Sequence, residues 1–149
     1  MYVECGQGGG GSDIKTAIKQ KVTDGLDVNY TFTSHQDRTS ISEGGIAIDT
    51  TNCIVYLYAD FTMLSDVGNT SDWYGILKTT TQMASSYMPR NNSSSSSRNA
   101  SMQIANDSSS DTNNPVLLVQ NYQSTTYIGT GYKKFLTGEH YIVYEIWPY

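Results

Sequence analysis

The sequence predicts an all-β fold: an antiparallel β-sandwich (jelly-roll-like) with one short N-terminal helix. Three observations predict it. After Val28 the apolar residues recur at every second position, the period of a strand with one buried face. Polar stretches rich in Ser, Asn and Gly separate these alternating segments, as turns do. Beyond residue 28 no helical pattern alternates with the strands, so the βαβ units of a parallel sheet are not expected.

The first predicted unit covers residues 1–27, and the predicted sheet domain covers residues 28–149. Within the first unit, residues 6–11 hold five glycines, which lose too much chain entropy to form a regular element. Ser12 or Asp13 can cap a helix that follows this segment, and Asp24-Gly25 would end it. The unit is therefore interpreted as a glycine-rich segment and a short helix that serve attachment or oligomerisation.

The predicted helix carries an apolar stripe. Ile14, Ala17, Ile18 and Val22 follow the spacing of one helical face, while lysines occupy much of the remainder. A helix of about ten residues is marginal in water by itself. Its stripe must therefore dock either on the main body or on neighbouring copies, and these four residues are the predicted assembly face.

The strands of the sheet domain follow from two-residue alternation. In the clearest one, at 53–61, Val55, Leu57 and Phe61 face one side, while Tyr56 and Tyr58 face the other. The remaining candidate strands, in order along the chain, are 28–33, 46–48, 73–80, 98–105, 116–122, 125–130 and 140–147. Several short strands separated by polar turns are typical of a sandwich or a barrel.

Composition excludes several classes of function. The net charge is −5 and only three arginines occur, which argues against binding to a nucleic-acid backbone. No apolar run approaches the length of a membrane-spanning helix, so no membrane insertion is expected. The N-terminus lacks a basic segment followed by an apolar one, so no signal peptide is expected. Cys5 and Cys53 are interpreted as free thiols, with a disulfide between them as the alternative.

The motifs that could carry catalysis or cofactor binding are weak. Gly6-x-Gly8-x-x-Gly11 matches a dinucleotide-binding pattern, but no buried parallel strand precedes it. The two histidines, His35 in a polar turn and His140 at the start of the last strand, are assigned structural or solvent-facing roles. Two Cys and two His that are remote from one another do not predict a zinc site. The sequence therefore predicts no catalytic residue, no metal and no cofactor, and the protein is expected not to be an enzyme.

Aromatic residues are the strongest functional signal, since the chain has 12 Tyr and 2 Trp. Tyrosine together with Ser, Gly and Asn is typical of adaptable recognition surfaces. Most of these rings are expected to pack across strands or between subunits. Trp73, Tyr74 and Tyr132 lie beside predicted turns, and they are the predicted ligand-facing residues.

From residue 53 onward the chain carries a series of short aromatic and apolar segments in a characteristic order: Leu57-Tyr58-Ala59-Asp60-Phe61-Thr62, Trp73-Tyr74-Gly75-Ile76-Leu77, Tyr87-Met88-Pro89-Arg90, Ser101-Met102-Gln103-Ile104, Val116-Leu117-Leu118-Val119 and Tyr141 to Tyr149. In this order and composition the chain from residue 53 onward resembles the β-sandwich head domains of bacteriophage fibre and baseplate receptor-binding proteins, and of head-fibre or capsid-decoration proteins. One departure is that Met83-Ala84-Ser85-Ser86 stands where Leu-Pro is usual.

This resemblance implies a non-enzymatic structural or adhesion protein of a phage virion, assembled in the host cytoplasm. Its implied partners are two further copies of itself in a homotrimer, other virion proteins, and a saccharide of the host surface. Two alternatives stay open at this point. One is a free-standing carbohydrate-binding module that stacks sugars on Trp73 or on neighbouring Tyr, and the other is a small hydrolase with a His-centred site.

Overall fold

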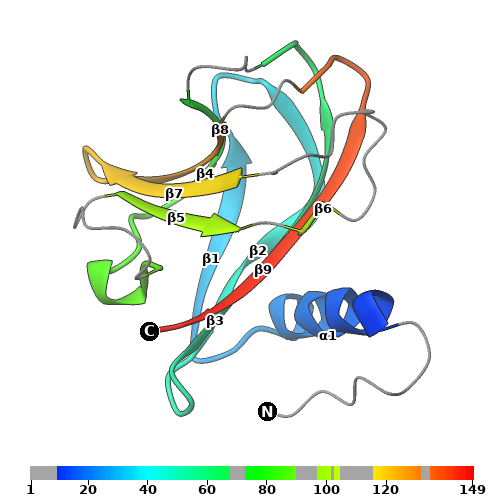
Figure 1. The fold of residues 1–149 in the computed structure, drawn as a ribbon. Helices are drawn as coiled ribbons and strands as arrows, with labels where there is room; N and C mark the ends of the chain where they lie inside the picture. Colours follow the sequence, from blue (N-terminus) through cyan, green and yellow to red (C-terminus); the bar gives the residue numbers. More distant parts are fainter. Residues whose placement is uncertain (1–9, 68–72, 90–96, 102, 105–115, 132–134) are drawn as a thin grey trace.

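The computed structural model of the protein describes residues 10–67, 73–89, 97–101, 103–104, 116–131 and 135–149 (Figure 1). Antiparallel strands and one short helix dominate these residues, which confirms the predicted fold class. The elements are α1 (Gly10–Asp24), β1 (Val28–Ser34), β2 (Thr39–Asp49), β3 (Ile54–Met63), β4 (Trp73–Thr79), the 3₁₀ turn η1 (Ser85–Tyr87), β5 (Ser97–Ser101), β6 (Gln103–Ile104), β7 (Val116–Tyr122), β8 (Thr125–Gly131) and β9 (His140–Pro148).

Helix α1 ends where the sequence predicts, but it begins earlier. Its first residue is Gly10, two positions before the predicted cap at Ser12. At its other end Gly25 adopts φ +80°, and its amide donates to the carbonyl of Lys21 at 3.0 Å. This left-handed glycine terminates the helix in the usual way. The Asn29 side chain then bonds both the amide and the carbonyl of Leu26, which fixes the chain as it enters β1.

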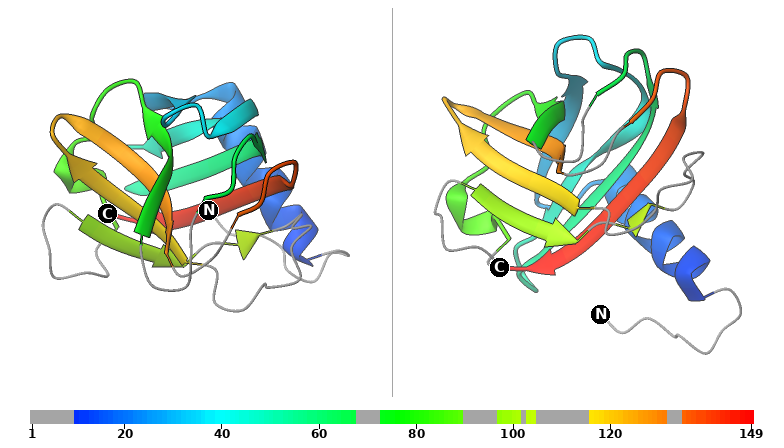
Figure 2. Two further views of the ribbon diagram at one scale, coloured as in Figure 1. Left: turned by 90° about the horizontal axis from the view of Figure 1, so that it is seen from above. Right: turned by 45° about the horizontal axis from the view of Figure 1, so that its top comes forward.

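Across the described residues the strands form one continuous sheet in the order β5-β7-β8-β4-β1-β2-β3-β9-β6. Strand β1 belongs to both halves of this sheet. Its first part pairs with β2, from Val28 opposite Ile48, and its last part pairs with β4, from Phe32 opposite Thr79. The sheet bends there, so that β4, β8, β7 and β5 fold over β2, β3 and β9 (Figures 1 and 2). The two layers are therefore halves of a single curled sheet.

The two edge strands of this order follow each other in the sequence. β5 ends at Ser101 and pairs with β7, whereas β6 begins at Gln103 and pairs with β9. Because two residues that lie two positions apart cannot be much more than about 7 Å apart, the two edges of the curled sheet come together at this point. The predicted strand 98–105 is thus divided between both edges.

The core lies between the two halves of the sheet. Strand β3 sends Val55, Leu57, Ala59, Phe61 and Met63 into it, and every one of them is buried. The opposite half contributes Leu77, Val119 and Ile128, which are buried as well. Alternate residues therefore point to the outer face, as the two-residue pattern predicts.

Side chains close the two ends of the curled sheet. At one end the rings of Phe61, Phe135 and Tyr141 contact one another, with centroid distances of 4.3–6.4 Å, and Val67 bridges to Phe135. At the other end Met83 and Met88 are buried beneath the turn η1. There the indole Nε1 of Trp147 donates to the Tyr87 carbonyl at 2.7 Å.

Candidate functional site

The predicted ligand-facing aromatics lie at the start of β4 and after the end of β8. Trp73 and Tyr74 open β4, where they pair with Gly131 and Thr130 of β8. Tyr132 follows Gly131 in the sequence but lies outside the described residues, as do the side chains of Trp73 and Tyr74. Their role in ligand binding therefore stays a prediction.

The predicted assembly face packs largely on the chain's own sheet. Ile18 is only 2% exposed and contacts a cluster of Tyr56, Tyr58 and Tyr144 on the outer face of β3 and β9, against which Val22 also packs. Ala17 is half-buried, and Ile14 at 36% stays exposed. Of the two alternatives, docking on the main body thus accounts for Ile18 and Val22 but not for Ile14.

Two lysines of α1 flank the buried tyrosines. Lys19 Nζ lies 5.8 Å from the ring centroid of Tyr58, and Lys21 Nζ lies 5.9 Å from that of Tyr56. A cation over an aromatic ring contributes about 0.5–1 kcal/mol at an exposed site. Burial, with a further contribution from the carboxylates of Asp60 and Glu43, raises the pKa of Tyr58 to about 12. The tyrosine therefore stays protonated at any physiological pH.

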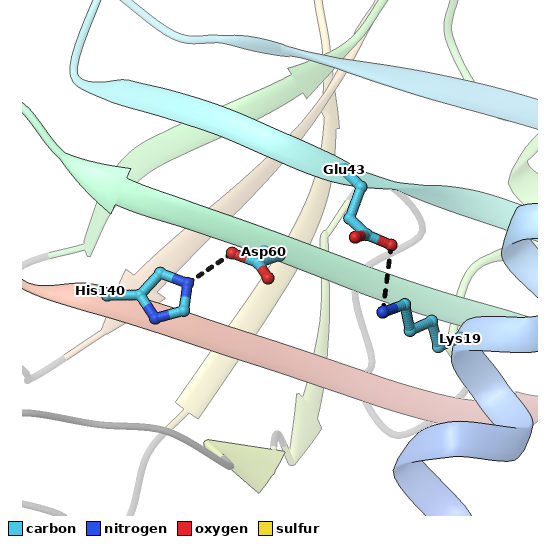
Figure 3. A network of polar contacts seen from close by, with 4 residues as sticks. All are labelled: Lys19, Glu43, Asp60 and His140. Carbon is cyan, nitrogen blue, oxygen red and sulfur yellow. Dashed lines mark hydrogen bonds and ion pairs between the residues drawn. The ribbon is translucent and has the colours of Figure 1, made fainter.

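Polar pairs surround this helix–sheet contact (Figure 3). Lys19 forms an ion pair with Glu43 of β2 at 3.5 Å, and both side chains are about half exposed. Such a surface pair contributes little to stability, at most about 1 kcal/mol. Next to it, His140 Nε2 of β9 lies 2.5 Å from Asp60 Oδ1 of β3. The first pair thus joins α1 to β2, and the second joins β3 to β9.

Both histidines occupy the positions that the sequence predicts, whereas Cys53, predicted to open a strand, lies in the turn before β3. His140 opens β9, and His35 lies in the turn after β1, where Gln36 and Asp37 adopt positive φ. Cys53 is a free, exposed thiol, whereas Cys5 lies outside the described residues. Within the described part of the chain, no group of three or more His, Cys, Asp or Glu could hold a metal ion. No helix there is long and apolar enough to cross a membrane.

Beside the docked helix an apolar patch remains partly exposed, which we call the β9 strip: Ile54, Ile146 and Pro148. Ile146 is 43% exposed, and Pro148 is exposed as well. Pro148 is the register partner of Ile54, so the three residues form one patch on the outer face of β3 and β9. The strip continues the apolar surface that begins under α1, and it is a candidate surface for contact with another protein chain.

A second candidate surface lies on the other half of the sheet and was not expected from the sequence. We call it the β4–β8 face: Thr33, Lys78, Tyr127 and Gln120. Consecutive register pairs place these four residues in one row across β1, β4, β8 and β7. They point outward because their chain neighbours, such as Phe32 and Ile128, are buried in the core. The sequence does contain a signal for this face, since none of these four strands contains Asp or Glu.

Glu145 lies on the inner side of β9, between Val143 and Trp147. Burial raises its pKa, an effect that the Ile146 amide, donating to Oε1 at 3.0 Å, partly opposes. The folded state therefore holds the Glu145 proton more tightly than the unfolded state does. Its contribution to stability is greatest below the ordinary pKa of 4.5, and it is lost as the pH rises through that value toward the folded-state pKa.

Replacing the Glu145 carboxyl with an amide of nearly the same shape removes the loss of stability that accompanies ionisation of this group. We expect Glu145→Gln to unfold at a higher urea concentration than the native chain at pH 7, and the difference to vanish at pH 3.5. Urea unfolding at both pH values measures it. Glu43→Gln is the matched control: it removes the exposed ion pair with Lys19, so its expected effect at pH 7 is a small loss of stability. A Glu145→Gln chain less stable than the native one at pH 7 would contradict this account.

Comparison with known proteins found no matching family model, no similar curated protein and no similar solved structure.

Proposed function

We propose that the chain is a non-enzymatic structural protein of a bacteriophage virion, of the fibre or capsid-decoration type. It assembles as a homotrimer and displays its curled sheet for adhesion to the host surface. Its further partners are other virion proteins and a saccharide of the host. The proposal rests first on the resemblance of residues 53–149 to fibre and baseplate head domains.

The observation that carries the assembly part of the proposal is the β9 strip. Exposed Ile146 lies within β9 next to Pro148, with Ile54 at the start of the neighbouring strand β3. Exposed apolar patches are typically covered by another chain, and identical copies cover them in closed symmetric assemblies.

Ile146→Asp tests the assembly. The native chain at micromolar concentration is expected to show three times the 16.4-kDa mass of one chain in light scattering coupled to size exclusion. The variant is expected to show the mass of one chain, because a carboxylate buried at the interface without a partner costs several kcal/mol. Tyr122→Asp is the control: it places the same charge on the other half of the sheet, at a residue 55% exposed, and it should leave the trimer intact. A stable monomer of the native chain would overturn the proposal.

The second candidate is a free-standing carbohydrate-binding module, which the exposure of Tyr122 favours. Its ring lies at the end of β7, opposite Thr125 of β8, where an aromatic side chain and a hydroxyl meet on the outer face. This candidate predicts a monomer that binds saccharide and that loses affinity in Trp73→Ala. The same mass measurement separates it from the virion protein.

A further inference from the structure

The β4–β8 face combines hydrogen-bonding groups with an aromatic ring in one short row. Thr33 and Gln120 offer a hydroxyl and an amide at its two ends, and Lys78 and Tyr127 are register partners at its centre. Lys78, Tyr127 and Gln120 are all partly accessible to solvent. Planar polar groups beside an aromatic ring are what a saccharide ring needs, since its hydroxyls form hydrogen bonds and its C–H groups pack on the aromatic side chain.

The turn after β1 adds two further side chains to this face. The ring of His35 contacts that of Tyr127 edge to face, with centroids 5.0 Å apart. Arg38 is held against β4 by a bond of 2.6 Å from Nη1 to the Gly75 carbonyl, and its Nη2 donates to Gln36 at 2.8 Å. A guanidinium has five N–H groups, so donors remain beyond these two bonds.

Positive charge concentrates here, although the whole chain carries −5. Burial lowers the pKa of His35, and the positive charges of Arg38 and Lys78 lower it further. The acidic residue nearest in sequence is Asp37, an exposed residue of the same turn. In addition, the buried Nδ1 of His35 has no hydrogen-bond partner among the described residues. An unpaired polar atom of this kind costs free energy that a bound ligand can recover through a shift of the ring.

From this arrangement we infer that the β4–β8 face binds a saccharide that carries a carboxylate. The carboxylate contacts Lys78 and Arg38, and the sugar ring lies beside Tyr127 with its hydroxyls toward Thr33 and Gln120. The inference rests on the proposed adhesion function and adds the class of ligand and the place where it binds. It also assigns this role to residues other than Trp73, Tyr74 and Tyr132.

Saturation-transfer NMR on the full chain tests the inference with defined probes. The acidic probes are 3′-sialyllactose and a hyaluronan tetrasaccharide, and the neutral probe is lactose. We expect at least one acidic probe to bind at millimolar concentration and lactose to bind far more weakly. Lys78→Gln should raise the Kd for the acidic probe roughly tenfold, the usual effect of losing one charge-assisted hydrogen bond.

Lys15→Gln is the matched control, because it makes the same change of charge on α1 and should leave the Kd unchanged. Tyr127→Ala should also weaken binding, and the dispersion of the amide spectrum shows whether each variant is folded. Three results would overturn the inference: no binding of either acidic probe, equal binding of lactose, or the same Kd in Lys78→Gln as in the native chain.

The pH dependence of binding gives an independent readout. Protonation of His35 adds a positive charge next to Lys78, Arg38 and Tyr127, so the affinity for the acidic probe should rise as the pH falls below 6.5, the ordinary pKa of a histidine, and His35→Gln should remove this change. These outcomes are independent of the mass measurement. A monomer that binds the probe through Lys78 would overturn the virion assembly alone, and a trimer that does not bind would overturn this inference alone.

Discussion

Gly44→Ala is expected to cost about 4 kcal/mol or more of the free energy of unfolding, a large share of the stability of a domain of this size. Gly44 adopts φ +142°, and a Cβ built on it lies 2.4 Å from the Tyr58 carbonyl oxygen and 2.7 Å from the Ala59 Cα. Both obstacles belong to the backbone of β3, so no side chain can rotate away. The variant must push β2 and β3 apart at the centre of the sheet. Chemical denaturation measures the loss.

Substitutions at two other glycines measure the two causes of that loss separately, namely the close approach of backbone atoms and the strain of a positive φ. Gly45 has no positive φ, but its Cβ would lie 2.6 Å from the Tyr30 carbonyl oxygen, so Gly45→Ala tests the close approach alone. Gly138 has φ +84° with nothing within 4 Å, so Gly138→Ala tests the backbone strain alone, at about 1–2 kcal/mol. We expect Gly44→Ala to cost most and Gly138→Ala least. An equal cost for Gly44→Ala and Gly138→Ala would show that the close approach of β2 to β3 is unimportant.

Thr126→Val is expected to cost about 3 kcal/mol, although it changes neither the size nor the shape of the side chain. Thr126 is fully buried, and its hydroxyl accepts the Met83 amide at 2.8 Å and donates to Asn121 Oδ1 at 2.5 Å. Asn121 in turn donates to the Met83 carbonyl at 3.0 Å. Without the hydroxyl a buried donor, the Met83 amide, and a part-buried acceptor, Asn121 Oδ1, lose their partner, at about 1–3 kcal/mol for the buried group and less for the other.

Thr79→Val is the control for this prediction. Thr79 is also buried and its hydroxyl donates to the Thr81 carbonyl, but Thr81 is exposed, so water can replace that bond. We expect a cost below about 1 kcal/mol, again from chemical denaturation. Equal costs for the two variants would contradict the role of Thr126 as the anchor of the segment that closes this end of the sheet.

The sequence pattern predicts most of the strands, because one face of each strand packs in the core and the other does not, and residues of different type therefore alternate along the strand. β3 is an instructive case, since its run of apolar and aromatic residues is buried on both sides, by the core on one and by α1 on the other. The first half of β2 was not expected from the sequence. Glu43, Gly44 and Gly45 resemble a turn in isolation, yet the two glycines are required because β1 and β3 approach the strand so closely.

The candidate surfaces were harder to predict than the strands. Tyr127 and His35 are 92 positions apart in the sequence, and only the pairing of β1 with β4 and of β4 with β8 brings them together. Likewise, the pattern of α1 indicated an apolar stripe but could not decide what covers it. That choice depends on tyrosines of β3 and β9, which are distant in the sequence. The periodicity of the local sequence therefore predicts the helix and the strands. The candidate surfaces depend instead on which distant residues the register of the sheet brings together.

The sheet ends in two short edge strands, β5 of five residues and β6 of two, and short edges limit self-templated fibre growth. Unpaired strand edges offer amides and carbonyls to any similar chain, which is the route by which β proteins stack indefinitely. β5 and β6 follow each other in the sequence and form the two edges of the sheet. If this stretch unfolded, the strands β7 and β9 that it covers would be exposed at the same time. Finite assemblies, rather than endless ribbons, are therefore favoured as long as residues 97–104 keep both pairings.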